Sequence, residues 1–321
     1  MTPVDKTCLI SVCVCTYRRT TALRELLGAL AIQEGLSEPF EIVIVDNDAA
    51  GSGKETVQRF RNSTPELSVR YFVEPQKNIA RARNRSVAEA KGKWVAFIDD
   101  DEVPEPTWLR HLFETAHKYK ADGVFAPVLP MLPKEAPEWI HRGRFFERPR
   151  HNTGEDVPVP EMRTGNSFLL ASWLEAFEAP FDAQYGLTGG SDTHFFARVL
   201  ANGARFVWCD EAIVYETISP SMANLRWLLL RSLRGGQTFA ERKLAEKGKL
   251  FGSGLLIWTA ATLALALMTA PLLLPFGVHR SVWWLRKGAT AAGKLLAFTP
   301  YRYEEYGTKR LKRPSKSTTT K

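Results

Sequence analysis

The sequence predicts an α/β fold with a mostly parallel central sheet flanked by helices, followed by a membrane-associated helical tail. Over residues 9–99, short apolar runs alternate with helical patterns, which is typical of parallel sheets with crossover helices. Polar side chains follow the ends of these runs, where α/β sheets usually bind their ligands. Residues 231–321 differ from the rest, because they combine a long uncharged stretch with many basic residues.

The first part of the chain contains four apolar runs, each predicted as a buried strand: residues 9–15, 42–45, 69–73 and 94–98. Helical patterns separate them near residues 23–30, 55–60 and 78–90. The carboxyl ends of parallel strands meet at one edge of a sheet. We therefore expect the residues that follow these strands to lie together, namely Thr16, Tyr17, Asp46, Asn47 and Asp99 to Asp101.

The fourth strand ends in a run of acids, Asp99 to Glu102. Adjacent carboxylates raise one another's pKa unless a cation lies among them, and hard oxygen ligands suit Mg²⁺ or Mn²⁺. The alternative is a solvated acidic turn or the first turn of a helix, since Pro104, Glu105 and Pro106 follow. The run by itself does not decide between a metal site and a turn.

Beyond the acids, the pattern predicts a helix over residues 108–118 and a strand over 124–129. Residues 130–160 contain many prolines, together with aromatic and basic side chains. We interpret this long loop as functional, for example as a lid, with disorder as the alternative. The elements predicted after it are a strand over 168–171, a short helix from 172, a helix over 193–202, strands over 204–208 and 212–215, and a long helix over 224–247.

The net positive charge of the chain comes from the tail. The formal net charge is +8, yet residues 231–321 hold 17 lysines and arginines against 4 acidic residues. Residues 1–230 therefore carry an excess of acid. This distribution argues against a surface that coats nucleic acid and favours an end that faces a membrane.

Residues 254–278 are free of charge, and about 20 apolar residues suffice to cross a membrane as a helix. Basic residues flank both sides of the stretch, which the positive-inside rule does not reconcile with a single crossing. Pro271 and Pro275 would break the segment into a re-entrant hairpin or a shallow dip. Trp283 and Trp284 would then lie at the interface. A buried soluble hairpin is the alternative.

The cysteines and the N-terminus indicate in which cellular compartment the protein folds. Cys8, Cys13 and Cys15 lie in one strand-like run, and Cys209 stands alone in another. No Cys-x-x-Cys pair is present, so reduced, buried thiols are expected. The first residues show no long apolar segment before a small-residue cleavage site, so no secretory signal is expected.

Several of these segments together resemble the family 2 glycosyltransferases, which have the GT-A fold. The segments are Cys13-Val14-Cys15-Thr16-Tyr17-Arg18, Val45-Asp46-Asn47, Asn78 with Ala82-Arg83-Asn84, Phe97-Ile98-Asp99-Asp100-Asp101, Gly165-Asn166, and Gly189-Gly190-Ser191-Asp192. The resemblance covers roughly residues 8–220, and its specificity comes from the order and spacing of the segments. The tail, with Tyr303-Glu304-Glu305-Tyr306, is similar to membrane-associated transferases that build bacterial exopolysaccharides of the succinoglycan type.

The resemblance implies a GT-A catalytic domain over residues 1–222, a basic linking helix over 223–250 and a membrane-associated helical tail over 251–321. It implies an inverting, metal-dependent glycosyltransferase that moves one sugar from a nucleotide-diphospho-sugar, expected to be a UDP-sugar, to a lipid-linked or polysaccharide acceptor. The enzyme would work at the cytoplasmic face of the bacterial inner membrane in cell-surface polysaccharide synthesis. No nucleic-acid partner is expected.

The family pattern also assigns expected roles at the donor site. Mn²⁺ or Mg²⁺ would bind to Asp99 and Asp101 and stabilise the diphosphate leaving group. Many relatives carry a further histidine ligand after the late strand; here Glu216 stands near that place, and its carboxylate can ligate either metal. The residues expected to contact the nucleotide are Thr16, Tyr17, Asp46, Arg83, Asp99 and Asp100, with Thr16, Tyr17 and Asp46 around the base.

Asp192 is the expected catalytic base. The acceptor hydroxyl must lose a proton as it attacks the anomeric carbon, and a carboxylate opposite the leaving group can take it. A single base without a nucleophilic carboxylate implies inversion. Relatives often carry Glu-Asp where this chain has Ser191-Asp192, and the aspartate is the residue usually assigned as base. The alternative is that Asp192 only caps the following helix.

Other functions stay open at this point. A nucleotidyltransferase would need a glycine-rich phosphate loop with a lysine after the first strand, where this chain has Thr16-Tyr17-Arg18-Arg19. A membrane-tethered protein could bind nucleotide sugars without catalysis. A processive synthase would carry several crossing helices and a Gln-x-x-Arg-Trp run, and the glutamine is missing before Leu225-Arg226-Trp227.

Overall fold

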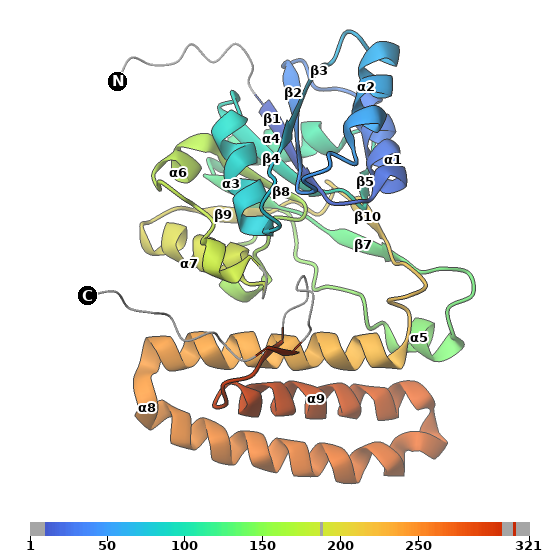
Figure 1. Ribbon diagram of the computed structural model, residues 1–321, viewed down its shortest axis with the longest axis vertical. Helices are drawn as coiled ribbons and strands as arrows, with labels where there is room; N and C mark the ends of the chain where they lie inside the picture. The colour runs from blue at the N-terminus through green and yellow to red at the C-terminus, as the bar shows by residue number, and fades with distance from the viewer. Residues whose placement is uncertain (1–9, 187–188, 304–310, 313–321) are drawn as a thin grey trace. The chain divides into compact units, whose positions relative to one another are not determined.

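The computed structural model describes residues 10–186, 189–303 and 311–312 and divides into two compact units (Figure 1). The first unit comprises Met1–Met131, Arg148–Gly186 and Gly190–Thr217. The second comprises Leu132–Glu147, Leu187–Gly189 and Ile218–Lys321. The first unit is an α/β structure, and the second consists mainly of helices.

The first unit is built on a seven-stranded sheet with the order β3-β2-β1-β4-β8-β6-β9. Its strands are β1 (Ile10–Thr16), β2 (Phe40–Asp46), β3 (Ser68–Val73), β4 (Trp94–Asp99), β6 (Gly123–Phe125), β8 (Ser167–Leu170) and β9 (Phe206–Trp208). Neighbouring strands from β3 to β4 pair in parallel, whereas β8 runs antiparallel to both β4 and β6. The predicted mostly parallel sheet is therefore confirmed, with one reversed strand.

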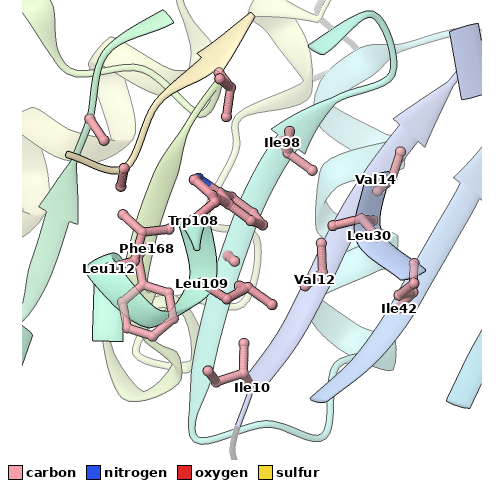
Figure 2. Close-up of a cluster of buried hydrophobic side chains, with 14 of the residues drawn as sticks. Ile10, Val12, Val14, Leu30, Ile42, Ile98, Trp108, Leu109, Leu112 and Phe168 are labelled. Carbon is pink, nitrogen blue, oxygen red and sulfur yellow. The ribbon is translucent and has the colours of Figure 1, made fainter. Parts of the chain in front are cut away.

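Helices cover both faces of this sheet. One face packs against α1 (Thr20–Ala31), α2 (Lys54–Ser63) and α4 (Trp108–Tyr119), and the other against α3 (Ile79–Glu89), α6 (Ala171–Glu175) and α7 (Ser191–Ala201). Successive strand residues point to opposite faces, so Val12 and Val14 join the first cluster and Cys13 the second. Figure 2 shows the first cluster, in which Trp108 and Leu109 of α4 lie among the strand side chains.

The prediction of one strand over residues 124–129 is wrong, because the structure has two shorter strands there. The chain leaves the large sheet after β6, and residues Val128–Met131 form β7 in a second sheet. Pro127 lies between the two strands, and it has no N–H to continue a ladder. The second sheet has the order β5-β10-β7, with β5 at Glu102–Pro104 and β10 at Val214–Thr217.

The second unit contains α5 (Glu138–Gly143), α8 (Leu225–Leu273) and α9 (Val278–Leu296). The predicted end of the long helix near residue 247 is wrong, because α8 continues through the linking segment into the uncharged stretch. A 3₁₀ turn, Leu274–Phe276, and Gly277 at φ 123° then lead into α9. The break thus falls beside Pro271 and Pro275, as expected for residues that interrupt a helix.

Within the second unit, α8 doubles back and α9 runs beside both of its arms (Figure 1). The packing is close at small residues. A Cβ atom on Gly293 would strike the backbone of Leu233 on the first arm, and one on Gly288 would lie 3.1 Å from Ala266 Cβ on the second. Of the apolar segment Gly254–Phe276, only 22% is buried, so the structure does not bury it as a core helix.

Short elements complete the fold. They are the 3₁₀ turns Val159–Glu161 and Ala183–Tyr185 and the paired strands β11 (Arg302–Tyr303) and β12 (Leu311–Lys312). The loop predicted over residues 130–160 holds α5 and the first of these turns. The motif at residues 303–306 lies mostly outside the described residues, as does Cys8.

The described cysteines Cys13, Cys15 and Cys209 are free, and burial raises the pKa of the Cys15 thiol to about 12.

Asn166 is a buried residue that joins α4 to two loops of the first unit. Its amide donates to the carbonyls of Pro127 and Ala212, each at 2.8 Å, and its Oδ1 accepts from Trp108 Nε1 at 2.7 Å. The residue has no exposed surface, and its φ is 53°. These contacts hold the turn between β6 and β7 next to the start of β8.

We expect the substitution Asn166→Ala to lower the free energy of unfolding by about 3 kcal/mol, because buried donors and acceptors lose their partner. Urea denaturation of the purified protein measures this loss. Asn62→Ala serves as the control, since Asn62 accepts one exposed hydrogen bond from Gln58. Equal stability of the two variants would contradict the structural role of Asn166.

Candidate active site

The three aspartates lie at the carboxyl end of β4, and an arginine lies among them. Arg19 Nη1 donates to Asp100 Oδ1 at 2.9 Å and to Asp101 Oδ2 at 2.6 Å. Thr16 Oγ1 donates to the other oxygen of Asp100 at 2.8 Å. Thr16 is the last residue of the neighbouring strand β1, so the predicted meeting of strand ends occurs here. The guanidinium group of Arg19 therefore supplies part of the positive charge that these acids require.

Two glutamates extend this cluster into the second sheet. Glu102 on β5 lies opposite Glu216 on β10 in the antiparallel register. Glu102 Oε2 accepts from the backbone N–H of Asp99 at 3.0 Å. Glu216 forms an ion pair with Arg148, with Nη2 and Oε2 2.6 Å apart. Arg148 belongs to the segment that the sequence predicted as a functional loop.

The cluster has more carboxyl groups than guanidinium groups. The carboxyl groups belong to Asp99, Asp100, Asp101, Glu102 and Glu216, and the guanidinium groups belong to Arg19, Arg83 and Arg148. Burial raises the pKa of Asp101 to about 7 although Arg19 opposes the shift, and burial beside Asp99 raises the pKa of Glu102 well above its usual range. Protons therefore balance part of the negative charge.

We expect the metal-free protein to lose stability as the pH rises from about 4 to about 7. A carboxyl group whose pKa is higher in the folded state than its unfolded value, about 4, favours folding at low pH and loses this contribution as the pH passes the folded value. Urea unfolding with a chelator, measured at several pH values, tests the trend. The difference in unfolding free energy between wild type and Asp101→Asn should change across this window and then level off above pH 7. A difference that is the same at pH 5 and pH 8 would contradict the expectation.

The predicted metal ligands fit a hard divalent cation by their chemistry, but they do not form a complete site alone. Among the described residues, no three His, Cys, Asp or Glu side chains are grouped so as to hold a metal ion. Arg19 takes one oxygen of Asp101, and Arg148 takes one of Glu216. The Asp99 side chain is 48% exposed, so its carboxylate is open to a ligand. When all five carboxyl groups of the cluster are ionised, they outnumber the three guanidinium groups by two charges, which matches a divalent ion.

Arg83 connects the acid cluster with the helix that carries Asp192. Its guanidinium group lies 3.9 Å from Asp99 Oδ1 and donates to Ser191 Oγ at 3.5 Å. The side chain is largely buried, 14% exposed, and lies over the ring of Phe181. The two halves of the predicted site, far apart in sequence, are therefore linked through one arginine of α3.

Asp192 lies in the first turn of α7 and is partly exposed. The N-cap position is taken by Gly190, with φ 101°, so Asp192 does not cap the helix in the manner that the alternative supposed. Its Oδ1 accepts from the N–H of Thr193 at 2.8 Å. The neighbouring His194 is half-buried beside Tyr185.

On the side expected to hold the base, Asp46 is completely buried. Its carboxylate accepts from the N–H of Gly53 at 2.6 Å, the hydroxyl of Tyr71 at 2.8 Å and the N–H of Asp48 at 3.0 Å. These bonds hold the loop after β2. Tyr17 is half-buried, with Lys77 Nζ 4.5 Å from its ring centroid. A contact between Asp46 and a base stays a prediction.

Sequence patterns did not assign Arg19, Glu102 and Arg148 to the site. Arg19 comes three residues after Thr16, and Glu102 follows the three aspartates directly. Both residues therefore lie close to the end of a predicted strand, and this closeness could have indicated that they belong to the site. Arg148 is one of several arginines in a loop. Its pairing with Glu216 joins residues 68 apart in the chain, and no spacing rule predicts it.

Comparison with known proteins finds relatives over most of the chain. The model of the family described as Glycosyl transferase family 2 matches residues 11–176, more than half of the chain. The succinoglycan biosynthesis protein ExoM of Rhizobium meliloti is 33% identical over 246 residues, which cover 76% of this chain and 77% of ExoM. ExoO of the same organism is 29% identical over 63% of this chain and 58% of its own length.

Solved structures show the same fold. The mannosyltransferase PcManGT from Pyrobaculum calidifontis, in complex with GDP-Man and Mn²⁺, has a TM-score of 0.58 at 18% identity and covers 91% of this chain and 88% of its own. TarS 1-349 of S. aureus, in complex with UDP-GlcNAc, has a TM-score of 0.54 at 17% identity, with coverages of 93% and 95%. The GT-A-like fold and the enzyme class expected from the sequence are confirmed: this chain belongs to glycosyl transferase family 2.

Proposed function

We propose that this glycosyltransferase is metal-dependent and inverting, and that it moves one sugar from a UDP-sugar to a lipid-linked or polysaccharide acceptor in exopolysaccharide synthesis. The observation that carries the proposal is the link through Arg83 between the acid cluster and the start of α7. ExoM and ExoO, named for succinoglycan biosynthesis, support the polysaccharide context. The UDP-GlcNAc complex of TarS supports the class of donor.

The acid cluster is the proposed site of the diphosphate. Asp99 and Asp101 would hold Mn²⁺ or Mg²⁺, with Glu216 as a further ligand; the ion would supply positive charge to the leaving group. Arg19 and Arg83 add guanidinium groups, whose planar donors suit phosphate oxygens. Because Asp100 accepts from both Thr16 and Arg19, its proposed role is to fix the end of β4 beside the ribose.

Asp192 is the proposed catalytic base. It takes the proton of the acceptor hydroxyl as that oxygen bonds to the anomeric carbon, while the bond from this carbon to the diphosphate oxygen breaks. Attack from the side opposite the leaving group inverts the anomeric configuration. Ser191 is held by Arg83, so Arg83 acts as a positioning residue for the base.

The proposed location is the cytoplasmic face of the inner membrane. Gly254–Phe276 is a helical stretch of 23 residues with a mean hydropathy of 1.9, long and apolar enough to cross a bilayer. Large apolar side chains are exposed along it and on into α9: Leu256, Ile257, Trp258, Leu265, Leu267, Met268, Leu272, Leu274, Phe276, Val278 and Trp283. Exposed apolar patches of this kind mark membrane or protein contacts, and the basic residues of the tail favour anionic lipid.

Transfer from a panel of labelled UDP- and GDP-sugars tests the proposal. The full-length protein is incubated with bacterial membranes and Mn²⁺ or Mg²⁺, and the products are extracted into organic solvent. We expect label from one UDP-sugar in the lipid fraction, with an anomeric configuration opposite to that of the donor by NMR. No transfer from any donor with either metal would contradict the proposal, and a retained configuration would contradict inversion.

A further inference from the structure

The second unit contains a cavity of about 230 Å³ between the two arms of α8 and α9. A single water needs roughly 15 Å³ measured in this way, so the cavity has room for a polyatomic group. The lining side chains that matter here are Thr259 and Thr262 on the second arm of α8 and Arg286, Lys287, Thr290 and Lys294 on α9.

The charge in this cavity has one sign. Arg286, Lys287 and Lys294 all line it, and no carboxylate does so among the described residues. None of the three takes part in an ion pair within the described part of the chain. Arg286 Nε donates to Ser232 Oγ at 3.2 Å, which fixes its guanidinium group at the cavity wall. Three cations gathered without a counterion repel one another, so the cavity favours an anion.

Thr259 is a hydroxyl donor without a partner. The residue is 1% exposed, and its Oγ1 has no hydrogen bond within the described structure. Two other threonines of the cavity instead bond back along their helices: Thr262 Oγ1 donates to the carbonyl of Trp258 at 2.8 Å, and Thr290 Oγ1 donates to that of Arg286 at 3.0 Å. A buried hydroxyl that makes no bond is unfavourable, and an oxygen-rich anion would accept from it.

The surroundings of the cavity are apolar and open. Trp258 lines the cavity with 70% of its surface exposed, and Ile257 and Met268 of the same arm are also exposed. An anion bound here would therefore lie next to the side chains that we propose for membrane contact. A ligand with a phosphate group and a long hydrocarbon chain matches both parts of this surface, whereas a soluble anion matches only the cavity.

We propose that this cavity binds the phosphate or diphosphate group of the lipid that carries the acceptor saccharide. The inference rests on the lipid-linked acceptor of the proposed function and names the part of the chain that would hold it. The three cations pair with the phosphate oxygens, Thr259 donates a hydrogen bond, and the hydrocarbon chain lies along the exposed face of α8. The second unit is then an acceptor-binding element rather than an anchor alone.

Co-sedimentation of the full-length protein with vesicles tests the proposal. Phosphatidylcholine vesicles are prepared alone, with a polyprenyl diphosphate, or with phosphatidylglycerol at the same charge density. We expect the polyprenyl diphosphate to strengthen binding the most. The double substitution Arg286→Gln and Lys287→Gln should remove this increment, weakening binding about tenfold or more. Thr259→Val, which keeps the shape of the side chain and the fold, should weaken it severalfold.

Arg280→Gln is the matched control, because Arg280 is an exposed arginine of α9 that does not line the cavity. If Arg280→Gln weakens binding as much as the double variant while Thr259→Val has no effect, the general positive charge of the tail explains the binding. That result would overturn the proposal that the cavity binds the phosphate group. Equal binding to phosphatidylglycerol, lost in the same variants, would overturn the assignment to the acceptor carrier. The assay contains no nucleotide sugar, so its failure leaves the proposed transfer reaction standing.

Discussion

Asp192→Asn is expected to reduce the rate of sugar transfer by about 10³-fold while nucleotide binding is retained, since general base catalysis contributes about 10²- to 10⁴-fold. Asparagine has nearly the shape of aspartate and can still accept from the N–H of Thr193, which Asp192 does at 2.8 Å. The helix should therefore begin as before. Single-turnover transfer with a labelled UDP-sugar, together with calorimetric binding of UDP, separates catalysis from binding.

Glu55→Gln is the matched control for Asp192. Glu55 lies in the first turn of α2, as Asp192 lies in the first turn of α7. Both substitutions remove a carboxylate that interacts favourably with the helix dipole, so a general loss of helix stability would affect both variants. Only Asp192→Asn should lose transfer. Retained transfer in Asp192→Asn would show that another group accepts the proton.

Asp101→Asn is expected to lower transfer by about 10²- to 10³-fold and to remove most of its dependence on Mn²⁺ or Mg²⁺, which follows from the loss of charge stabilisation at the leaving group. The amide keeps an oxygen for Arg19, which Asp101 contacts at 2.6 Å, but it no longer carries a charge that can ligate a metal. Titration of the initial rate with Mn²⁺, at saturating donor, measures both effects.

The control for Asp101 is Asp210→Asn. Asp210 also pairs with an arginine, Arg150, through two hydrogen bonds of 2.9 and 2.7 Å, and it lies outside the acid cluster. Its substitution tests whether the loss of any aspartate–arginine pair slows transfer. An Asp101→Asn enzyme that responds to Mn²⁺ like the wild type would contradict the assignment of Asp101 as a ligand.

Much of the first unit could be predicted from sequence periodicity. The runs that became β1, β2 and β4 are apolar on both faces, as expected for strands covered by helices on each side. Because the direction of these strands follows from their crossover helices, the meeting of Thr16 with Asp100 could be predicted without coordinates.

Other features depend on contacts between distant segments. β6 and β7 are separate strands because β7 pairs with β10, some 85 residues later in the chain. A local apolar run does not indicate which distant strand it pairs with. The length of α8 was missed for a different reason: the change from basic to apolar composition near residue 250 suggests a boundary, yet helical hydrogen bonds are indifferent to side-chain polarity.

The reversed strand β8 has a consequence for how active sites in such sheets are composed. An antiparallel strand contributes its beginning, not its end, to the edge where the parallel strands finish, and Ser167 of β8 pairs with Phe97 of β4. Gly165 consequently lies against the acids: a Cβ there would come within 2.8 Å of Glu102 Oε1 and 3.2 Å of Asp99 Oδ2. The size of this one residue ahead of β8 thus limits how much space is left beside the carboxylates of Asp99 and Glu102.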